Sequence, residues 1–139
     1  MTAETSGEGA ARRLADSFIH LGLGASAVPQ PPFDGIEWYE AYGERHGSDG
    51  REGRLVSQHG FAESWDSWEM HPHGSEVVIC TEGAMVLTQE FPDGHREQVR
   101  LAAGDYAINP PGVWHTADVE SPVTAIFITA GEGTQHRPR

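Results

Sequence analysis

The chain has 139 residues and a formal net charge of -12 at pH 7. This length indicates one domain with its own hydrophobic core, and the acidic charge argues against a nucleic acid or an anionic membrane surface as a partner. The single cysteine, Cys80, excludes an intrachain disulfide. No apolar run approaches the ~20 residues of a membrane-spanning helix, and residues 1–11 contain no apolar segment of the signal-peptide type. We therefore expect a cytoplasmic protein.

The first third of the chain precedes the main domain. Residues 1–13 are small and polar and show no apolar period, which predicts a disordered lead. Residues 14–53 form the predicted N-terminal extension. Within it, residues 14–23 fit either a short helix or an edge strand, and three prolines over residues 29–32 predict an extended connector.

A short helix is predicted inside this extension. Asp34 is a suitable N-cap for a helix over residues 35–44. Trp38 and Tyr42 lie four residues apart, so one side of this helix is aromatic. We expect the aromatic side to pack on the outside of a sheet.

From residue 54 onward the pattern changes to short β-rich runs separated by turns. The predicted strands cover residues 55–61, 67–71, 77–81, 85–91, 97–101, 106–109, 114–119 and 123–129. Short strands at a spacing of roughly ten residues indicate an all-β sandwich or barrel, and Asp93-Gly94 marks the clearest hairpin. We assign residues 54–130 to this β-barrel domain and residues 131–139 to an exposed C-terminal tail.

Side chains that bind metals gather in two places. His71, His73 and Glu76 lie close together, and His115 follows a Pro-Pro-Gly turn at residues 110–112. Imidazole and carboxylate groups together suit a divalent ion such as Fe, Mn, Ni, Co or Zn. The sequence therefore predicts a metal site assembled from two separate segments.

These two segments resemble the paired motifs of the cupin superfamily. The residues that match the first motif are His71, His73, Glu76 and Gly83, and those that match the second are Gly104, Pro110, Gly112 and His115. The resemblance implies a cupin double-stranded β-helix, or jelly-roll barrel, and the predicted short helical and extended segment precedes it. It also implies a bound metal and a homodimer.

The first motif departs from the family pattern in its spacing. Only two residues separate His73 from Glu76, where three or four are usual. The usual spacing is restored if Glu69 takes the place of the first histidine. His71, Glu76 and His115 are ligands in either register, and the fourth ligand is His73 or Glu69. Both lie on the same face of a strand, and we favour His73 because imidazole is the commoner metal ligand.

Strand alternation predicts the wall of a pocket around the metal. Side chains two and four residues beyond a ligand point to the same side of a strand. If Glu76 and His115 point inward, the inner wall comprises Val78, Cys80, Ala117 and Val119. Such an apolar pocket with a metal at its base suits a small organic ligand.

The resemblance implies several possible activities, because cupins include dioxygenases, isomerases, decarboxylases, cyclases and non-catalytic binding modules. We expect a metal-dependent enzyme of oxygenase or isomerase/cyclase type that acts on a small molecule, with Glu76 or Glu69 as the base. The alternative is a module that binds or senses a small ligand or a metal without turnover. An enzyme that moves protons should place a second ionisable group in the pocket, so the apolar wall slightly favours oxygen chemistry or plain binding.

The remaining histidines and the tryptophans have simpler interpretations. We expect each isolated histidine to be a surface or structural residue, namely His20, His46, His59, His95 and His136. Trp65, Trp68 and Trp114 are expected in the core or at a dimer interface, and Cys80 is expected to be a small core residue.

Overall fold

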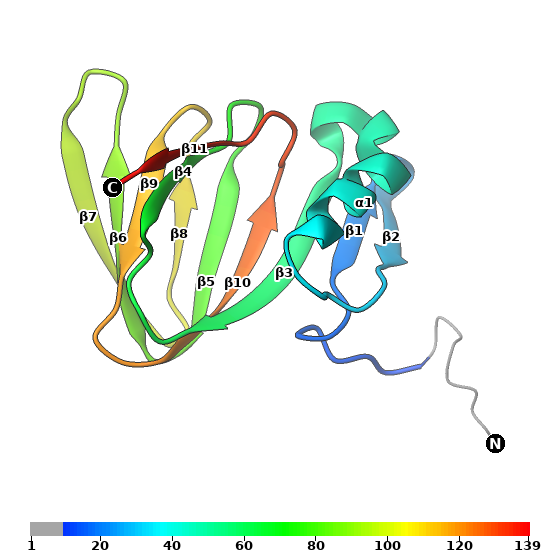
Figure 1. Cartoon of the computed structure of the whole chain (residues 1–139), viewed down its shortest axis with the longest axis horizontal. Coiled ribbons are helices and arrows are strands. Elements are labelled where there is room, and N and C mark those ends of the chain that lie inside the picture. The colour runs from blue at the N-terminus through cyan, green and yellow to red at the C-terminus, as the bar shows by residue number, and fades with distance from the viewer. Residues whose placement is uncertain (1–9) are drawn as a thin grey trace.

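Two antiparallel sheets face each other in the computed structural model, which describes residues 10–139 (Figure 1). In spatial order the six-stranded sheet contains β2 (Ser26–Pro29), β1 (Ile19–Gly22), β3 (Arg54–Phe61), β10 (Val123–Thr129), β5 (Glu76–Glu82) and β8 (Tyr106–Asn109). The five-stranded sheet contains β11 (Gln135–Pro138), β4 (Ser67–Met70), β9 (Trp114–Asp118), β6 (Ala84–Glu90) and β7 (Arg96–Ala102). The helical segments are η1 (Leu23–Ala25), α1 (Glu37–His46) and η2 (Gly47–Glu52). The predicted lead over residues 1–13 lies largely outside the described residues.

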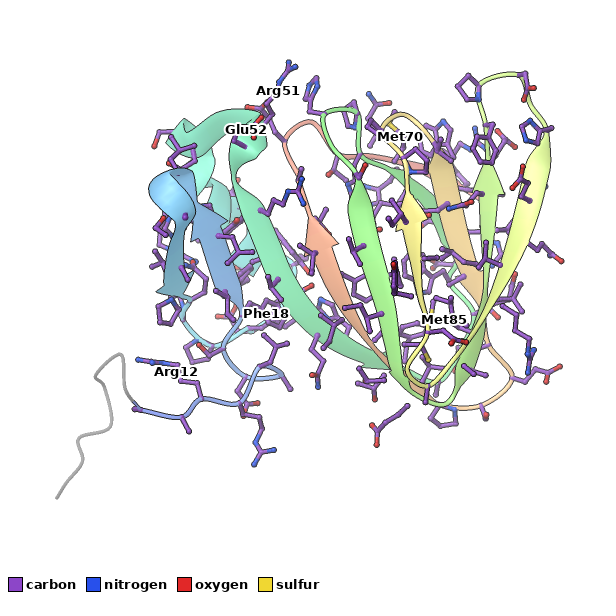
Figure 2. All side chains as sticks on the ribbon, turned by 180° about the vertical axis from the view of Figure 1, so that it is seen from behind. Arg12, Phe18, Arg51, Glu52, Met70 and Met85 are labelled. Atoms are coloured by element: carbon purple, nitrogen blue, oxygen red, sulfur yellow. The ribbon has the colours of Figure 1, made fainter. Side chains whose placement is uncertain are left out.

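Alternating burial along the strands builds the core between the two sheets. In β5 and β10, buried residues alternate with half-buried ones, because successive side chains of a strand point to opposite faces. Strands of both sheets contribute to this core, which comprises Val78, Cys80, Met85, Leu87, Leu101, Ala117, Val123, Ala125 and Phe127. Met85 is labelled in Figure 2. The expected all-β jelly-roll architecture is confirmed.

Every strand that the sequence predicts is present, and its ends lie within one residue of the predicted ends. The hairpin at Asp93-Gly94 joins β6 to β7 as expected, and the Gly94 N–H donates to the Phe91 carbonyl at 2.8 Å. Strand β1 matches the strand alternative for residues 14–23, although β2 and not β1 lies at the edge of the sheet. Strands β2 and β11 were not predicted. Among the described residues, no helix combines the length and the apolar character needed to cross a membrane.

The N-terminal extension joins the six-stranded sheet, because β1 pairs with β3 and β2 pairs with β1. Its helix α1 begins at Glu37, and Asp34 does not cap it. The predicted N-cap is wrong because Gly35 adopts a φ of 129°, so the backbone immediately after Asp34 is not helical.

An aromatic cluster fixes α1 to this sheet. Phe18, Trp38 and Leu55 are buried together, with Phe33 and Tyr42 packed against them. The Trp38 indole N–H donates to the Pro31 carbonyl at 3.0 Å, which satisfies the polar atom of a buried ring. Phe18 is labelled in Figure 2. The predicted packing of the aromatic side of the helix against a sheet is thus observed.

The predicted C-terminal tail is a strand, since β11 pairs with β4 at the edge of the five-stranded sheet (Figure 1). The Arg137 guanidinium lies 5.0 Å from the ring centroid of Trp68 and 4.5 Å from that of Trp114. It also donates to Glu90 at 2.6 Å. Cation–π contacts and an ion pair therefore anchor a strand whose polar sequence lacks the apolar alternation on which the prediction relied.

Gly83 and Gly94 form a matched pair for testing the turns of the barrel. Their φ values are +80° and +90°, but a β-carbon at Gly83 would lie 2.5 Å from the Pro122 carbonyl oxygen, whereas at Gly94 it would meet nothing within 4 Å. We expect Gly94→Ala to lower the free energy of unfolding only by left-handed backbone strain of about 1–2 kcal/mol. Gly83→Ala should cost more, because the clash adds to the strain. Urea denaturation measures both, and equal losses would contradict the packing described at Gly83.

Candidate metal centre

Four buried or half-buried side chains converge on one point. Glu69 lies in β4, His71 follows the end of β4, Glu76 begins β5, and His115 lies in β9. His71 Nε2 lies 3.4 Å from Glu69 Oε1 and 3.2 Å from Glu76 Oε2. His115 Nε2 lies 3.5 Å from Glu69 Oε1 and 3.1 Å from Glu76 Oε1. One donor atom of each residue lies within 4.8 Å of the others, which makes the group a candidate site for a metal ion.

The fourth member of this group is Glu69, and the preference for His73 is corrected. His73 is exposed and its ring lies beside Gly133, outside the group. Strand β4 ends at Met70, so the alternation of faces that put His73 in line with His71 does not continue to residue 73. Glu69 is inside the strand and is the register partner of His115 on β9.

The imidazoles of this group keep nitrogen atoms without a hydrogen-bond partner. Among residues 10–139, the buried side-chain nitrogens and oxygens in that state are His71 Nε2, His115 Nδ1 and His115 Nε2. The short N···O distances to the two glutamates therefore lack hydrogen-bonding geometry. A buried polar atom without a partner costs about 1–3 kcal/mol. The two Nε2 atoms lie beside the carboxylates, and a metal ion bound there would satisfy both of them, whereas His115 Nδ1 points away from that position.

A hydrogen bond on the far side of the ring orients His71. Its Nδ1 lies 2.8 Å from the Thr134 hydroxyl oxygen, and that hydroxyl donates its own hydrogen to the Gly131 carbonyl. The Thr134 oxygen therefore accepts from Nδ1–H, so in the neutral ring Nε2 carries the lone pair and faces the carboxylates. Partners of this kind fix the tautomer and the orientation of metal-binding histidines.

Two hydrogen bonds hold the Glu76 carboxylate. The Asn109 amide donates to Oε1 at 3.0 Å, and the Thr129 hydroxyl donates to Oε2 at 2.7 Å. The Gln89 amide in turn donates to the Asn109 side-chain oxygen at 2.8 Å. Since each carboxylate oxygen accepts in about two directions, each Glu76 oxygen keeps one accepting direction beside an imidazole nitrogen. The role of Glu76 as a base stays a prediction.

Opposite charges hold the group in its charged form. Burial opposes ionisation of the carboxyl groups, but His115 and His71 outweigh it, which lowers the pKa of Glu76 to about 2 and that of Glu69 well below its usual range. Burial likewise opposes protonation of the imidazoles, but the two carboxylates raise the pKa of His71 to about 9 and also raise that of His115. Without a metal, protons would therefore occupy the imidazole nitrogens.

A cavity of about 710 Å³ lies against this group, between the barrel and the N-terminal extension. The aromatic and aliphatic side chains that line it include Ile36, Tyr39, Tyr42, Leu55, Phe61, Trp65 and Phe127. The ionisable side chains that line it include His20, His46, His59, Glu69, His71, Glu76 and His136. The volume falls in the range of small-molecule pockets.

The predicted apolar wall does not line this cavity. Val78, Cys80 and Ala117 are fully buried in the main core, and Val119 packs against it. Their inward orientation follows the predicted alternation, but the space on that side is filled by facing side chains of the other sheet. The open side of the ligand group faces the N-terminal extension, whose contribution to the cavity no sequence pattern indicated.

Several residues of the site carried no sequence signal of their own. His136 was expected to be isolated, yet its Nε2 lies 2.9 Å from Glu69 Oε2. His59 also lines the cavity, where its Nε2 lies 3.0 Å from the Tyr39 hydroxyl. These contacts join segments that are far apart in the chain, so no local spacing could have revealed them. Glu69 was the exception, because restoring the motif spacing identified it as one of two alternatives.

Parts of several solved structures are similar in fold to this chain. Peruvianin-I, a cysteine peptidase from the latex of Thevetia peruviana, is 25% identical with a TM-score of 0.50, over 59% of this chain and 54% of that one. An oxalate oxidase is 13% identical with a TM-score of 0.51, over 58% and 44%. Oxalate decarboxylase from Bacillus subtilis is 17% identical with a TM-score of 0.50, over 62% and 23%. The aligned part thus spans about half or less of these proteins.

A search of curated proteins found none that matches this chain. The family model described as "Cupin domain" matches residues 58–131, which is more than half of the chain. These residues include all four members of the candidate metal centre. Together with the two-sheet fold, this match establishes that the chain belongs to the cupin family.

Proposed function

We propose that the protein is a metal-dependent enzyme that acts on a small, largely apolar organic molecule. The observation that carries the proposal is the set of partnerless imidazole nitrogens beside two carboxylates at the wall of a large cavity. Glu69, His71, Glu76 and His115 would hold the ion. A bound divalent ion supplies Lewis-acid polarisation of a substrate oxygen.

The donor set favours some ions over others. Two carboxylates neutralise a divalent ion, so the occupied centre carries no net charge, which suits a buried site. Exchanging the expected His73 for Glu69 also makes the set richer in oxygen. Oxygen ligands suit Mn(II), whereas imidazole suits Fe and Zn, so among the expected ions we favour Mn(II) or Fe(II).

The rest of the cavity supports an enzyme over a plain binding module. The Tyr39 hydroxyl lies 3.0 Å from His59 Nε2. Partial burial, followed by the charges of Glu69 and Glu76, raises the pKa of Tyr39, although 42% of this residue is exposed, and burial lowers that of His59. Tyr39 is therefore a neutral hydrogen-bond donor beside the centre. An isomerase or cyclase needs ionisable groups of this kind to transfer protons. The apolar pocket wall predicted from the sequence contains none of them apart from the metal ligands.

The similar structures do not indicate a single type of reaction. They include an oxidase, a decarboxylase and a cysteine peptidase, and one fold supports unrelated chemistries. A peptidase role for Cys80 is not supported, because this thiol is fully buried in the main core and burial raises its pKa. A thiol needs an exposed, electropositive setting to act as a nucleophile.

Metal content tests the proposal directly. After reconstitution with Mn(II) or Fe(II), we expect wild-type protein and His73→Ala to retain the ion through gel filtration. Glu69→Ala and His115→Ala should lose affinity by more than about 100-fold, beyond the loss typical of an outer partner. Plasma mass spectrometry gives the stoichiometry. Wild-type protein that retains none of the expected ions would refute the proposal, and loss only in His73→Ala would reinstate the first assignment.

Thr134→Val tests the orientation of His71. Removing the hydroxyl that accepts from Nδ1–H frees the ring to adopt the other tautomer, so we expect metal affinity to fall about 10–100-fold. Thr124→Val is a matched control, since the Thr124 hydroxyl is likewise hydrogen-bonded to a side chain, to which it donates, but that side chain is Glu82 and lies away from the centre. Competitive titration with a chelating dye measures both affinities. Equal affinities for the two variants would show that the tautomer is fixed by other means.

Proton release on metal binding is a further expected outcome. Because the pKa of His71 in the metal-free protein is raised to about 9, its Nε2 carries a proton at neutral pH that the ion must displace. Metal affinity should therefore weaken as the pH falls, since protons compete for the imidazoles. Isothermal titration calorimetry in buffers of different ionisation enthalpy counts the protons. A heat that is independent of the buffer would contradict this expectation.

A further inference from the structure

We propose that Asp49, His20 and Tyr42 form a proton relay that takes a proton from a ligand hydroxyl in the cavity. The relay lies in the N-terminal extension, outside the metal centre. The relay adds a proton acceptor to the proposed function and rests on that function for the identity of the reaction. The relay itself does not need the metal.

The three residues make a continuous chain of hydrogen bonds. His20 in β1 places Nε2 2.7 Å from Asp49 Oδ2 in η2, and Nδ1 2.6 Å from the Tyr42 hydroxyl oxygen in α1. His20 is 2% exposed. Both His20 and Tyr42 line the cavity that also touches the metal ligands. The chain thus leads from the cavity to a buried imidazole and on to a carboxylate.

The Asp49 carboxylate at one end determines which atom donates in each hydrogen bond of the chain. An ionised Asp49 only accepts, so His20 Nε2 carries the hydrogen and Nδ1 accepts the Tyr42 hydrogen. The bond from His20 lowers the pKa of Asp49, and burial, followed by the charge of Asp49, raises that of Tyr42 to about 12. The Tyr42 oxygen keeps lone pairs that can accept a hydrogen bond from a ligand.

Two glycines make room for the pair of His20 and Asp49. A β-carbon at Gly22 would lie 2.7 Å from Asp49 Oδ2 and 3.0 Å from His20 Nε2, and one at Gly53 would lie 3.0 Å from His20 Cε1. Both glycines have negative φ values, -107° and -73°, so backbone conformation does not require glycine there. The close approach of the two side chains does, which indicates that the fold is built around this pair.

His46 could suggest a second metal site, because it lies with His20 and Asp49. The two imidazole rings are stacked, however, with centroids 4.0 Å apart and planes 17° apart. Nitrogen lone pairs lie in the ring planes, so those of stacked rings run side by side and do not converge on one ion. The Gln30 amide nitrogen also lies 2.9 Å from His46 Nε2, and Arg45 holds the amide oxygen. His46 therefore has its own partner.

The proposed step balances protons without forming a phenolate. The ligand O–H bond breaks and its proton binds the Tyr42 oxygen, while the original Tyr42 O–H bond breaks and that proton binds His20 Nδ1. The electron pair of the broken bond stays on the ligand oxygen. His20 becomes an imidazolium that the Asp49 carboxylate stabilises, as in other Asp–His pairs. The apolar lining, with Phe61, Trp65 and Phe127, suits an aromatic or enolic hydroxyl as the donor.

4-Nitrophenol is a suitable probe, because only its ionised form is strongly coloured. With Zn(II)-loaded wild-type protein, we expect the bound probe to be more ionised than the free probe at the same pH. Tyr42→Phe and Asp49→Asn should each lower the ratio of ionised to neutral bound probe by about tenfold, which is one pKa unit. Asp49→Asn acts by reversing the His20 tautomer. The matched controls are Tyr106→Phe and Asp93→Asn, which alter an exposed tyrosine and an exposed Asp–His pair.

The outcomes separate the relay from the metal centre. His115→Ala should lose the metal but keep the effect of the relay on the probe. An ionised fraction that falls in His115→Ala and is unchanged in Tyr42→Phe and Asp49→Asn would assign the ionisation to the metal and overturn the relay. Nitrogen NMR of the wild-type protein is a second measurement that needs no variant. A His20 with hydrogen on Nδ1, or a second equivalent of Zn(II) that disappears in His20→Gln, would also overturn it.

Discussion

The buried charges of the candidate metal centre must be compensated, and many contacts of the structure contribute to this. Two carboxylates and two imidazoles lie together where water is largely excluded, and isolated charges there would be costly. The fold supplies hydrogen-bond partners for most of the other polar atoms of these four side chains. Asn109 and Thr129 bond to Glu76, Thr134 bonds to His71, and His136 bonds to Glu69. The nitrogens left over define where an ion fits. Both sheets meet at this point, since Glu76 belongs to one sheet and Glu69 and His115 belong to the other.

The cavity is a composite of two parts with different origins. The barrel provides the ligand group and the aromatic side chains Phe61, Trp65 and Phe127, while the extension provides Tyr39 and Tyr42 on α1. Stacking of Trp38 on Tyr42 and the pairing of β1 with β3 hold the extension in place. Much of the cavity wall therefore comes from a segment that lies outside the residues matched by the family model.

The sequence predicted the barrel well because its strands combine regular alternation with clear turn residues. It identified three members of the ligand group outright and Glu69 as one of two alternatives. The choice of His73 failed because alternation was extended past Met70, where β4 ends. The pocket wall was wrong for a different reason: alternation tells which residues point inward, but not whether the inner space is filled. The contacts of His20, His59 and His136 depend on tertiary packing, which has no local pattern.

The part played by residues 131–138 has a consequence for how the protein matures. Thr134 orients His71, and His136 contacts Glu69, so this segment completes the surroundings of two ligands. During synthesis it leaves the ribosome after all four ligand residues, and a barrel that has already collapsed lacks these two contacts until β11 docks beside β4. Metal capture by the nascent chain would therefore meet a loosely ordered His71. The pairing of β11 with β4 is therefore the last step that orders the surroundings of the candidate metal centre.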